Sequence, residues 1–129
     1  MAYKERQLII TKDGSHTVSI PEMKVTYHSH HGAIQGSLNG FIKAGLKYIL
    51  DSQNLPVMYI FAMGFGTGLN ALLTLIAAER LQQPVHYTAI ELYPLQAEEI
   101  KSLNYCEQLK RADLESVFQL LHKCEWEKD

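Results

Sequence analysis

The chain has 129 residues, of which 47% are hydrophobic and 20% charged, and its formal net charge is −2. This length suits one small domain, and the composition excludes disordered, collagen-like and disulfide-rich proteins. No apolar run reaches the roughly 20 residues that span a bilayer, and the charged residues at positions 4–6 argue against a signal peptide. We therefore expect a cytoplasmic protein with no membrane partner.

Charges and cysteines are unevenly placed along the chain. Residues 1–50 hold six Lys and Arg against three acids, whereas residues 51–129 hold six against eleven. A phosphate-rich partner would meet the N-terminal part first, although chance explains so small an asymmetry equally well. The two cysteines, Cys106 and Cys124, are too few for a disulfide framework, so we expect free thiols that contribute to packing.

The first third of the chain predicts a β-hairpin followed by a helix. Residues 8–11 and 17–20 are rich in β-formers and flank Asp13-Gly14, which is a turn signal because glycine accepts a positive φ. Residues 23–28 extend a strand or lead into a loop. The glycines within residues 32–40 predict a loop that opens into a helix, and apolar residues then recur at helical spacing over residues 41–51.

The middle of the chain predicts a strand–helix–strand unit and hence an α/β fold. Residues 57–62 form a continuous apolar run, typical of a strand buried on both faces of a parallel sheet. After a glycine-rich turn, apolar residues over 69–77 share one helical face, and Pro84 is expected to end that helix. Residues 85–90 predict a second strand. Two helices follow, one with Pro94 in its first turn and one with an apolar face that carries Leu114, Val117, Phe118 and Leu121.

The turn Gly64-Phe65-Gly66-Thr67-Gly68 is the strongest functional signal. Its glycines let a ligand lie against bare backbone, and the following helix offers unpaired N–H groups. A dinucleotide site favours G-x-G-x-x-G/A, whereas here Leu69 takes the sixth position, which favours the S-adenosylmethionine type over an NAD-type oxidoreductase. Glu91, at the end of the next strand, can accept both ribose hydroxyls of an adenosine-type ligand. A structural turn and a solvated strand end are the alternatives.

The sequence around this turn resembles a known family. Residues 63–74 (MGFGTGLNALLT) are similar to the first motif of the MnmC/MnmD-type methyltransferases, which convert 5-aminomethyl-2-thiouridine at the wobble position of certain tRNAs to its 5-methylaminomethyl form. Residues 27–33 with 41–42, residues 87–95, and residues 103–105 with 121–122 resemble further family motifs. The resemblance covers about residues 25–126.

The resemblance implies a Rossmann-like class I methyltransferase fold, truncated to its cofactor-binding half, with an N-terminal β-hairpin extension. We expect a single incomplete domain over residues 1–129, with the extension at 1–31 and the cofactor-binding βαβ half at 32–129. The implied cofactor is S-adenosyl-L-methionine and the implied partner is tRNA. The residues expected at the cofactor are Tyr27, Ser29, Gly32, Gly64, Phe65, Gly66, Thr67, Gly68, Asn70, Glu91 and Leu92.

The chain departs from the family pattern in three ways. Ala62 stands where the family usually has an acid two residues before the first glycine, and Gly36 and Asn39 stand where it has Glu and His. The later half of the family, with an Asp-containing signature, has no counterpart in this sequence, so no catalytic base is assigned. No second dinucleotide fingerprint is present, so the FAD-dependent activity of some family members is not expected here.

Three further expectations concern partners and rival functions. A non-catalytic or degenerate nucleotide-binding or interaction module would keep the fold without the reaction. His28, His30 and His31 lie close together, but no Cys or acidic residue has a recognised zinc-site spacing, so no metal is expected. Two parallel strands leave an open sheet edge, at which we expect self-association or a chain that completes the sheet.

Overall fold

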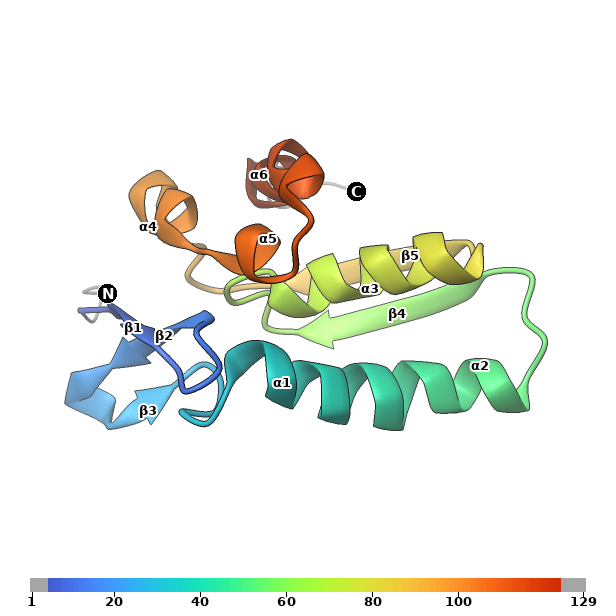
Figure 1. Ribbon diagram of the computed structural model, residues 1–129, viewed down its shortest axis with the longest axis horizontal. Coiled ribbons are helices and arrows are strands. Elements are labelled where there is room, and N and C mark those ends of the chain that lie inside the picture. Colours follow the sequence, from blue (N-terminus) through green and yellow to red (C-terminus); the bar gives the residue numbers. More distant parts are fainter. Residues whose placement is uncertain (1–4, 124–129) are drawn as a thin grey trace.

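The computed structural model describes residues 5–123, and it begins with the predicted hairpin and a third short strand (Figure 1). The strands are β1 (Gln7–Ile10), β2 (His16–Ile20) and β3 (Val25–Thr26), with a 3-10 turn (Pro21–Met23) between the last two. All pairings in this sheet are antiparallel, and β2 lies at its centre. The Asp13 carboxylate accepts the Ser15 N–H at 2.9 Å and shapes the hairpin loop.

A long helical segment follows, made of α1 (Ala33–Ser37), a π-helical stretch (Leu38–Lys47) and α2 (Tyr48–Ser52). It confirms the helix expected over residues 41–51. The loop expected over residues 32–40 opens into a helix as predicted, but it does so already at Ala33. The helix begins at Ala33 because the hairpin loop supplies acceptors for its first N–H groups. Ala33 donates to Thr11 Oγ1 at 3.0 Å, and Gln35 donates to Asp13 Oδ2 at 2.9 Å. Such capping outweighs the poor helix propensity of the glycines.

The central unit is the predicted strand–helix–strand, made of β4 (Met58–Met63), α3 (Leu69–Leu81) and β5 (Val85–Ile90). The two strands pair in parallel, from Met58 opposite Val85 to Met63 opposite Ile90. Helix α3 ends before Pro84 is reached, because Gln82 adopts left-handed backbone with φ 52°. The fold is therefore mixed α/β, as the sequence predicts.

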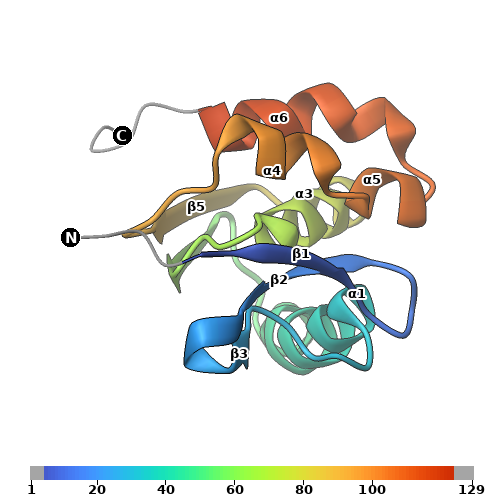
Figure 2. The ribbon, with the colours of Figure 1, turned by 90° about the vertical axis from the view of Figure 1, so that its left-hand side faces the viewer.

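One face of the β4–β5 sheet is open. The expectation that the strand over residues 57–62, which is β4, is buried on both faces is therefore wrong. Tyr59, Phe61 and Met63 are 75%, 63% and 77% exposed. Side chains alternate along a strand, and the next strand repeats the same alternation of exposure. Figure 2 shows α3 near the centre of the molecule, between α1 on one side and α4 and α6 on the other. Among the described residues, the helices leave the second face of the sheet uncovered.

The C-terminal part consists of α4 (Ala97–Ser102), α5 (Tyr105–Gln108), a 3-10 turn (Ala112–Leu114) and α6 (Glu115–Lys123). The predicted apolar face of the last helix is confirmed, because Leu114 and Phe118 are buried. Pro94 does not lie in the first turn of a helix. Helix α4 begins later, because Gln96 and Glu99 form a reciprocal capping box at its start.

The core forms where β2 meets helices α1, α3, α4, α5 and α6. Its most buried large side chains, each at most 1% exposed, are Val18, Leu69, Leu72, Tyr105 and Phe118. Cys106 is a free thiol in this core, and burial raises its pKa to about 12. Cys124 lies outside the described residues. Within residues 5–123, no helix is long and apolar enough to cross a membrane.

Candidate functional site

The glycine turn between β4 and α3 has a backbone that requires its glycines. Gly64, Gly66 and Gly68 have φ of 91°, 58° and 83°, in the left-handed region. A Cβ on Gly68 would lie 2.8 Å from His122 Nε2, and a Cβ on Gly66 would lie 3.4 Å from the Tyr27 ring. Side chains are thus disfavoured by the backbone conformation and, at Gly68, excluded by space. Tyr27 from the N-terminal segment covers the turn, where the resemblance places it.

Two side chains from the C-terminal helices form hydrogen bonds with the turn at Thr67, which is 1% exposed. The Tyr105 hydroxyl donates to Thr67 Oγ1 at 3.1 Å. His122 Nε2 lies 2.7 Å from the Thr67 carbonyl oxygen, so this nitrogen carries the proton. Burial raises the pKa of Tyr105 and lowers the pKa of His122, which favours the neutral form of each side chain.

Glu91 contacts the glycine turn directly. Its Oε1 accepts the Gly66 N–H at 2.7 Å, and its Oε2 accepts the Tyr93 N–H at 3.1 Å. The carboxyl ends of parallel strands meet at one edge of a sheet, and this explains why the residue after β5 reaches the turn after β4. A carboxylate has about four acceptor positions, so both oxygens keep room for ligand hydroxyls.

The backbone around Glu91 further limits what a ligand can reach. The N–H groups of Gly64 and Phe65 both donate to the Ile90 carbonyl oxygen at 2.9 Å, and they are therefore engaged within the sheet. Helix α3 begins at Leu69, and no side chain caps its N-terminus within the described residues. The donors at this helix end are the groups that suit an anionic or carboxylate-bearing ligand.

The remaining predicted residues are distributed around the turn. Asn70 and Ser29 line one small cavity of about 330 Å³, and within the described part of the chain the buried Oδ1 of Asn70 has no hydrogen-bond partner. Leu92 is 78% exposed. The Phe65 ring packs edge-on against His122, with centroids 5.0 Å apart. The structure therefore brings most of the predicted set together.

Gly32, which was also predicted at the cofactor, lies against the hairpin loop. A Cβ at this position would be 2.6 Å from the Asp13 carboxylate, beside the first turn of α1. The structure therefore explains the glycine at this position by its close packing against the hairpin loop. The role in cofactor binding that the resemblance implies for Gly32 stays a prediction.

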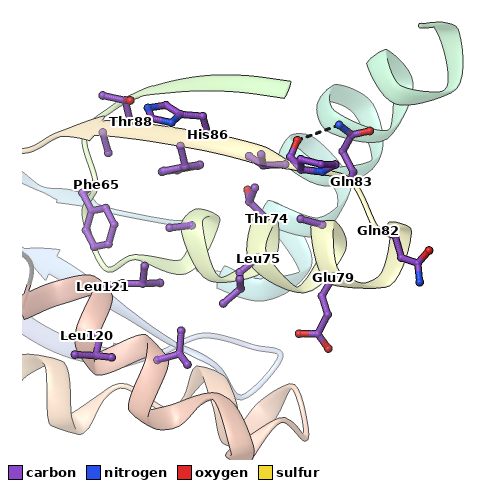
Figure 3. A pocket seen from close by; sticks show the side chains of 17 residues that line it. Phe65, Thr74, Leu75, Glu79, Gln82, Gln83, His86, Thr88, Leu120 and Leu121 are labelled. Atoms are coloured by element: carbon purple, nitrogen blue, oxygen red, sulfur yellow. Dashed lines mark hydrogen bonds between the residues drawn. The ribbon is translucent and has the colours of Figure 1, made fainter. Parts of the chain in front are cut away.

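A larger groove lies on the far side of β5 (Figure 3). It has a volume of about 1390 Å³ and lies between β5, α3 and α6, with Leu75, Ala78 and Leu121 among its apolar lining. Five consecutive residues, 85–89, line it. Because successive side chains point to opposite faces of a sheet, the groove faces the edge of β5. In the described part of the chain, β5 pairs with β4 alone.

The three histidines of the N-terminal segment, His28, His30 and His31, have different surroundings. His28 Nδ1 lies 2.8 Å from Thr17 Oγ1, and desolvation lowers the pKa of His28. His30 and His31 are exposed. Within residues 5–123 no group of three or more His, Cys, Asp or Glu side chains is arranged to hold a metal ion.

These features define an α/β protein with a glycine turn at a parallel strand–helix junction and an acid poised on it. No family model matches the chain. The chain is 30% identical over 104 residues to the tRNA 5-methylaminomethyl-2-thiouridine biosynthesis bifunctional protein MnmC of Acidovorax sp. (strain JS42), an alignment that covers 78% of this chain and 15% of that protein. The crystal structure of MnmC2 from Aquifex aeolicus matches with a TM-score of 0.64 and 28% identity, over 73% of this chain and 32% of the other.

The chain is thus MnmC-like, as the sequence motifs indicate. It corresponds to one part of these proteins, because it spans less than a third of the Aquifex chain and about a seventh of the Acidovorax protein.

Proposed function

We propose that this chain is the S-adenosyl-L-methionine-binding part of a Rossmann-like class I methyltransferase that modifies the wobble uridine of tRNA. The observation that carries the proposal is the Glu91 carboxylate, which accepts the Gly66 N–H at 2.7 Å across the glycine turn. The likeness to MnmC proteins supports tRNA modification as the process. The methyltransferase activity and the cytoplasmic location are parts of this proposal.

Several features of the turn fit such a cofactor. The position of a Cβ on Gly64 has no neighbour within 4 Å, so the backbone there is open to a ligand. Glu91 keeps free acceptor positions for two ribose hydroxyls. The buried Oδ1 of Asn70 lacks a partner among the described residues, and a ligand N–H or O–H would satisfy it.

The roles of the residues follow from these contacts. The backbone of Gly64 to Gly68 would lie against the aminoacyl part of the cofactor, and Glu91 would orient the ribose. Tyr27, which already packs on Gly66, would shield the site from water. The bound cofactor would supply a methyl group on a sulfonium for transfer to an amine, a reaction in which the protein contributes chiefly position and a neutral acceptor.

The proposal includes a strand that completes the sheet at the free edge of β5. The groove of about 1390 Å³ beside that edge is lined by apolar side chains of α3 and α6, which suits the side chains of an added strand. A second copy of this chain or a further polypeptide segment could supply the strand. The tRNA partner is proposed from the process in which the MnmC relative acts.

Calorimetric titration of the purified chain with S-adenosylmethionine and S-adenosylhomocysteine tests the cofactor. We expect micromolar dissociation constants, about −8 kcal/mol, and no binding of NAD. Gly66→Val should weaken binding at least about tenfold, because a β-branched residue is strained at positive φ. Glu91→Gln should have a similar effect, because it removes a charged acceptor.

Glu98→Gln is the matched control, since Glu98 is exposed on α4, and it should bind as the wild type does. A failure of the wild type to bind either cofactor form would contradict the proposal. Binding without methylation of tRNA, even with a completing polypeptide added, would favour the alternative of a non-catalytic binding module.

A further inference from the structure

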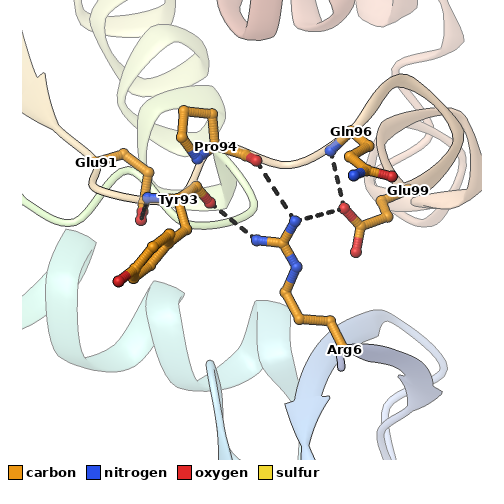
Figure 4. Close-up of polar contacts among 6 residues, drawn as sticks. All are labelled: Arg6, Glu91, Tyr93, Pro94, Gln96 and Glu99. Atoms are coloured by element: carbon orange, nitrogen blue, oxygen red, sulfur yellow. Dashed lines mark hydrogen bonds and ion pairs between the residues drawn. The ribbon is translucent and has the colours of Figure 1, made fainter. Parts of the chain in front are cut away.

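Arg6, just before β1, reaches across the molecule to the loop that follows β5 (Figure 4). Its side chain is 5% exposed. The guanidinium donates to the Tyr93 carbonyl oxygen at 2.9 Å and to the Pro94 carbonyl oxygen at 3.5 Å. It also pairs with Glu99 Oε1 at 2.8 Å. One buried cation thus engages two backbone carbonyls and one carboxylate of the same segment.

Tyr93, whose carbonyl oxygen accepts a hydrogen bond from Arg6, also donates a hydrogen bond to Glu91. The Tyr93 N–H donates to Glu91 Oε2 at 3.1 Å, while Glu91 Oε1 accepts the Gly66 N–H at 2.7 Å. Tyr93 is therefore fixed at its carbonyl by Arg6 and in turn fixes the acid through its amide. A continuous series of hydrogen bonds connects the N-terminal segment to the glycine turn.

The chemistry of this contact suits an arginine better than a lysine. The planar guanidinium presents several N–H donors in a fixed fork, whereas a lysine ammonium is a point charge on a flexible stem. Glu99 Oε1 also accepts the Gln96 N–H at 2.8 Å, at the start of α4. The Arg6–Glu99 pair thereby ties the loop to the first turn of that helix, and the loop between β5 and α4 is held at both ends.

We propose that Arg6 is a positioning residue that orients the Glu91 carboxylate and so makes the site discriminate ribose from deoxyribose in its ligand. The inference rests on the proposed function, because it assumes an adenosine-type ligand at the glycine turn. Arg6 itself does not touch that ligand. It acts through Tyr93. Replacing Arg6 is therefore expected to weaken binding of the ribose form more than binding of the deoxyribose form, and not to weaken both equally.

The test compares the affinities of S-adenosylhomocysteine and its 2′-deoxy analogue for each variant. In the wild type the ribose form should bind about tenfold more tightly, the size expected for one hydrogen bond to a charged group. In Arg6→Lys and Arg6→Met this ratio should fall to about threefold or less. A ratio that stays at the wild-type value in both variants, with both affinities unchanged or lowered in proportion, would overturn the inference.

Arg111 supplies the matched control. It pairs with Asp113 at 3.0 Å and with Glu79 at 3.4 Å, away from the glycine turn. Arg111→Met removes the same charge from a more exposed arginine, which pairs with carboxylates only, and it should keep the tenfold ratio. A ratio lowered equally by Arg111→Met would show a general effect of lost charge and would also overturn the inference.

A measurement without ligand separates this inference from the proposed function. Amide hydrogen exchange of Gly66, read by NMR, should be about tenfold faster in Arg6→Lys than in the wild type, since a displaced Glu91 no longer accepts that N–H. The Leu72 amide, which donates to the Gly68 carbonyl oxygen at 2.9 Å, serves as the internal reference. Unchanged exchange at Gly66 contradicts the positioning role. Failure of the wild type to bind either ligand contradicts the proposed function and with it the ribose selectivity, whereas the positioning of Glu91 by Arg6 is still decided by the exchange of the Gly66 amide.

Discussion

At the scale of single residues, the glycine turn owes its shape to side chains that lie far away in sequence. The Thr67 hydroxyl oxygen accepts a hydrogen bond from Tyr105, and the Thr67 carbonyl oxygen accepts one from His122. The His122 ring also packs edge-on against Phe118, with centroids 4.9 Å apart. The histidine is thus enclosed by aromatic rings and a backbone carbonyl, surroundings that favour a neutral imidazole.

This enclosure predicts a pH-dependent stability. Desolvation lowers the pKa of His122 below its ordinary 6.5, so in this pH range the unfolded chain binds more protons than the folded protein. The free energy of unfolding should therefore be largest above about pH 7 and fall as the pH drops through about 6. Thermal melting between about pH 7.5 and 5.5 measures the effect.

The variant His122→Gln isolates the contribution of this residue. Glutamine keeps an N–H donor for Thr67 but does not titrate, so the melting temperature should depend less steeply on pH. Some slope should persist, because desolvation also lowers the pKa of His28. A variant with the full wild-type slope would show that His122 is not the titrating group.

The sequence predicted the residues of the site unevenly, for a physical reason. Glycine spacing and a strand-end acid are local patterns, and they identified the turn and Glu91. The clamps by Arg6, Tyr105 and His122 depend on partners 87, 38 and 55 residues away. No periodicity within one segment encodes such contacts. The nearest available signal was the family resemblance at residues 103–105 and 121–122, which named positions without giving their roles.

At the scale of elements, helix α6 packs on the core through Phe118, its most buried apolar side chain. Phe118 is 1% exposed and packs edge-on against Tyr105, with centroids 6.0 Å apart. Phe118→Ala should lower the free energy of unfolding by about 3–5 kcal/mol, because it leaves a cavity in the core. Urea denaturation, analysed with the slope held common, measures the change.

Two companion variants keep this prediction decisive if Phe118→Ala does not fold. Phe118→Leu should destabilise by a smaller amount, since leucine refills part of the space. Leu120→Ala on the same helix removes a side chain that is 66% exposed, and it should change stability by less than about 0.5 kcal/mol. Equal losses from Phe118→Leu and Leu120→Ala would contradict the assigned packing.

Element boundaries show where local patterns fail. Residues 32–40 read as a loop because of their glycines, yet α1 begins at Ala33 since Thr11 and Asp13 accept its first N–H groups. Those acceptors belong to a hairpin loop about 20 residues earlier. The strands β1, β2, β4 and β5 and helix α3, which follow local apolar patterns, were predicted to within a residue at their starts, whereas β3 begins two residues after the start of the expected segment 23–28. The division of the chain at residue 31 stays a prediction.

At the scale of the whole molecule, the β4–β5 sheet as described over residues 5–123 has an exposed face, and β5 has an edge without a pairing strand. The Met58 N–H donates to the Pro84 carbonyl, and the Gly64 N–H donates to the Ile90 carbonyl. Hydrogen bonds in a parallel pair recur at every second residue, so the even-numbered residues of β5 bond to β4. Val85, Tyr87 and Ala89 therefore present their backbone groups to the groove.

This alternation predicts how association through the edge can be blocked. If a second copy completes the sheet, light scattering at high protein concentration should give a mass above that of one chain. Ala89→Pro removes an outward N–H without removing a bond to β4, and it should shift the mass towards one chain. Thr88→Ala, which leaves the backbone donors intact, is the control.

A wild-type mass equal to one chain at high concentration would contradict self-association through this edge. The sequence could suggest the edge from the count of strands. The open face could not be predicted, because an apolar run such as residues 57–62 has the same pattern whether one face or both are covered.

The pair between Arg6 and Glu99 also has a consequence for the order of events during synthesis. The two residues are 93 positions apart, a distance that a ribosome takes about 5–20 seconds to translate. An isolated hairpin forms in about 1–10 microseconds. The β1–β2 hairpin can therefore form and dissolve many times before its anchor is made, so docking of the N-terminal strand is expected to be a late, post-hairpin event in the folding of the nascent chain.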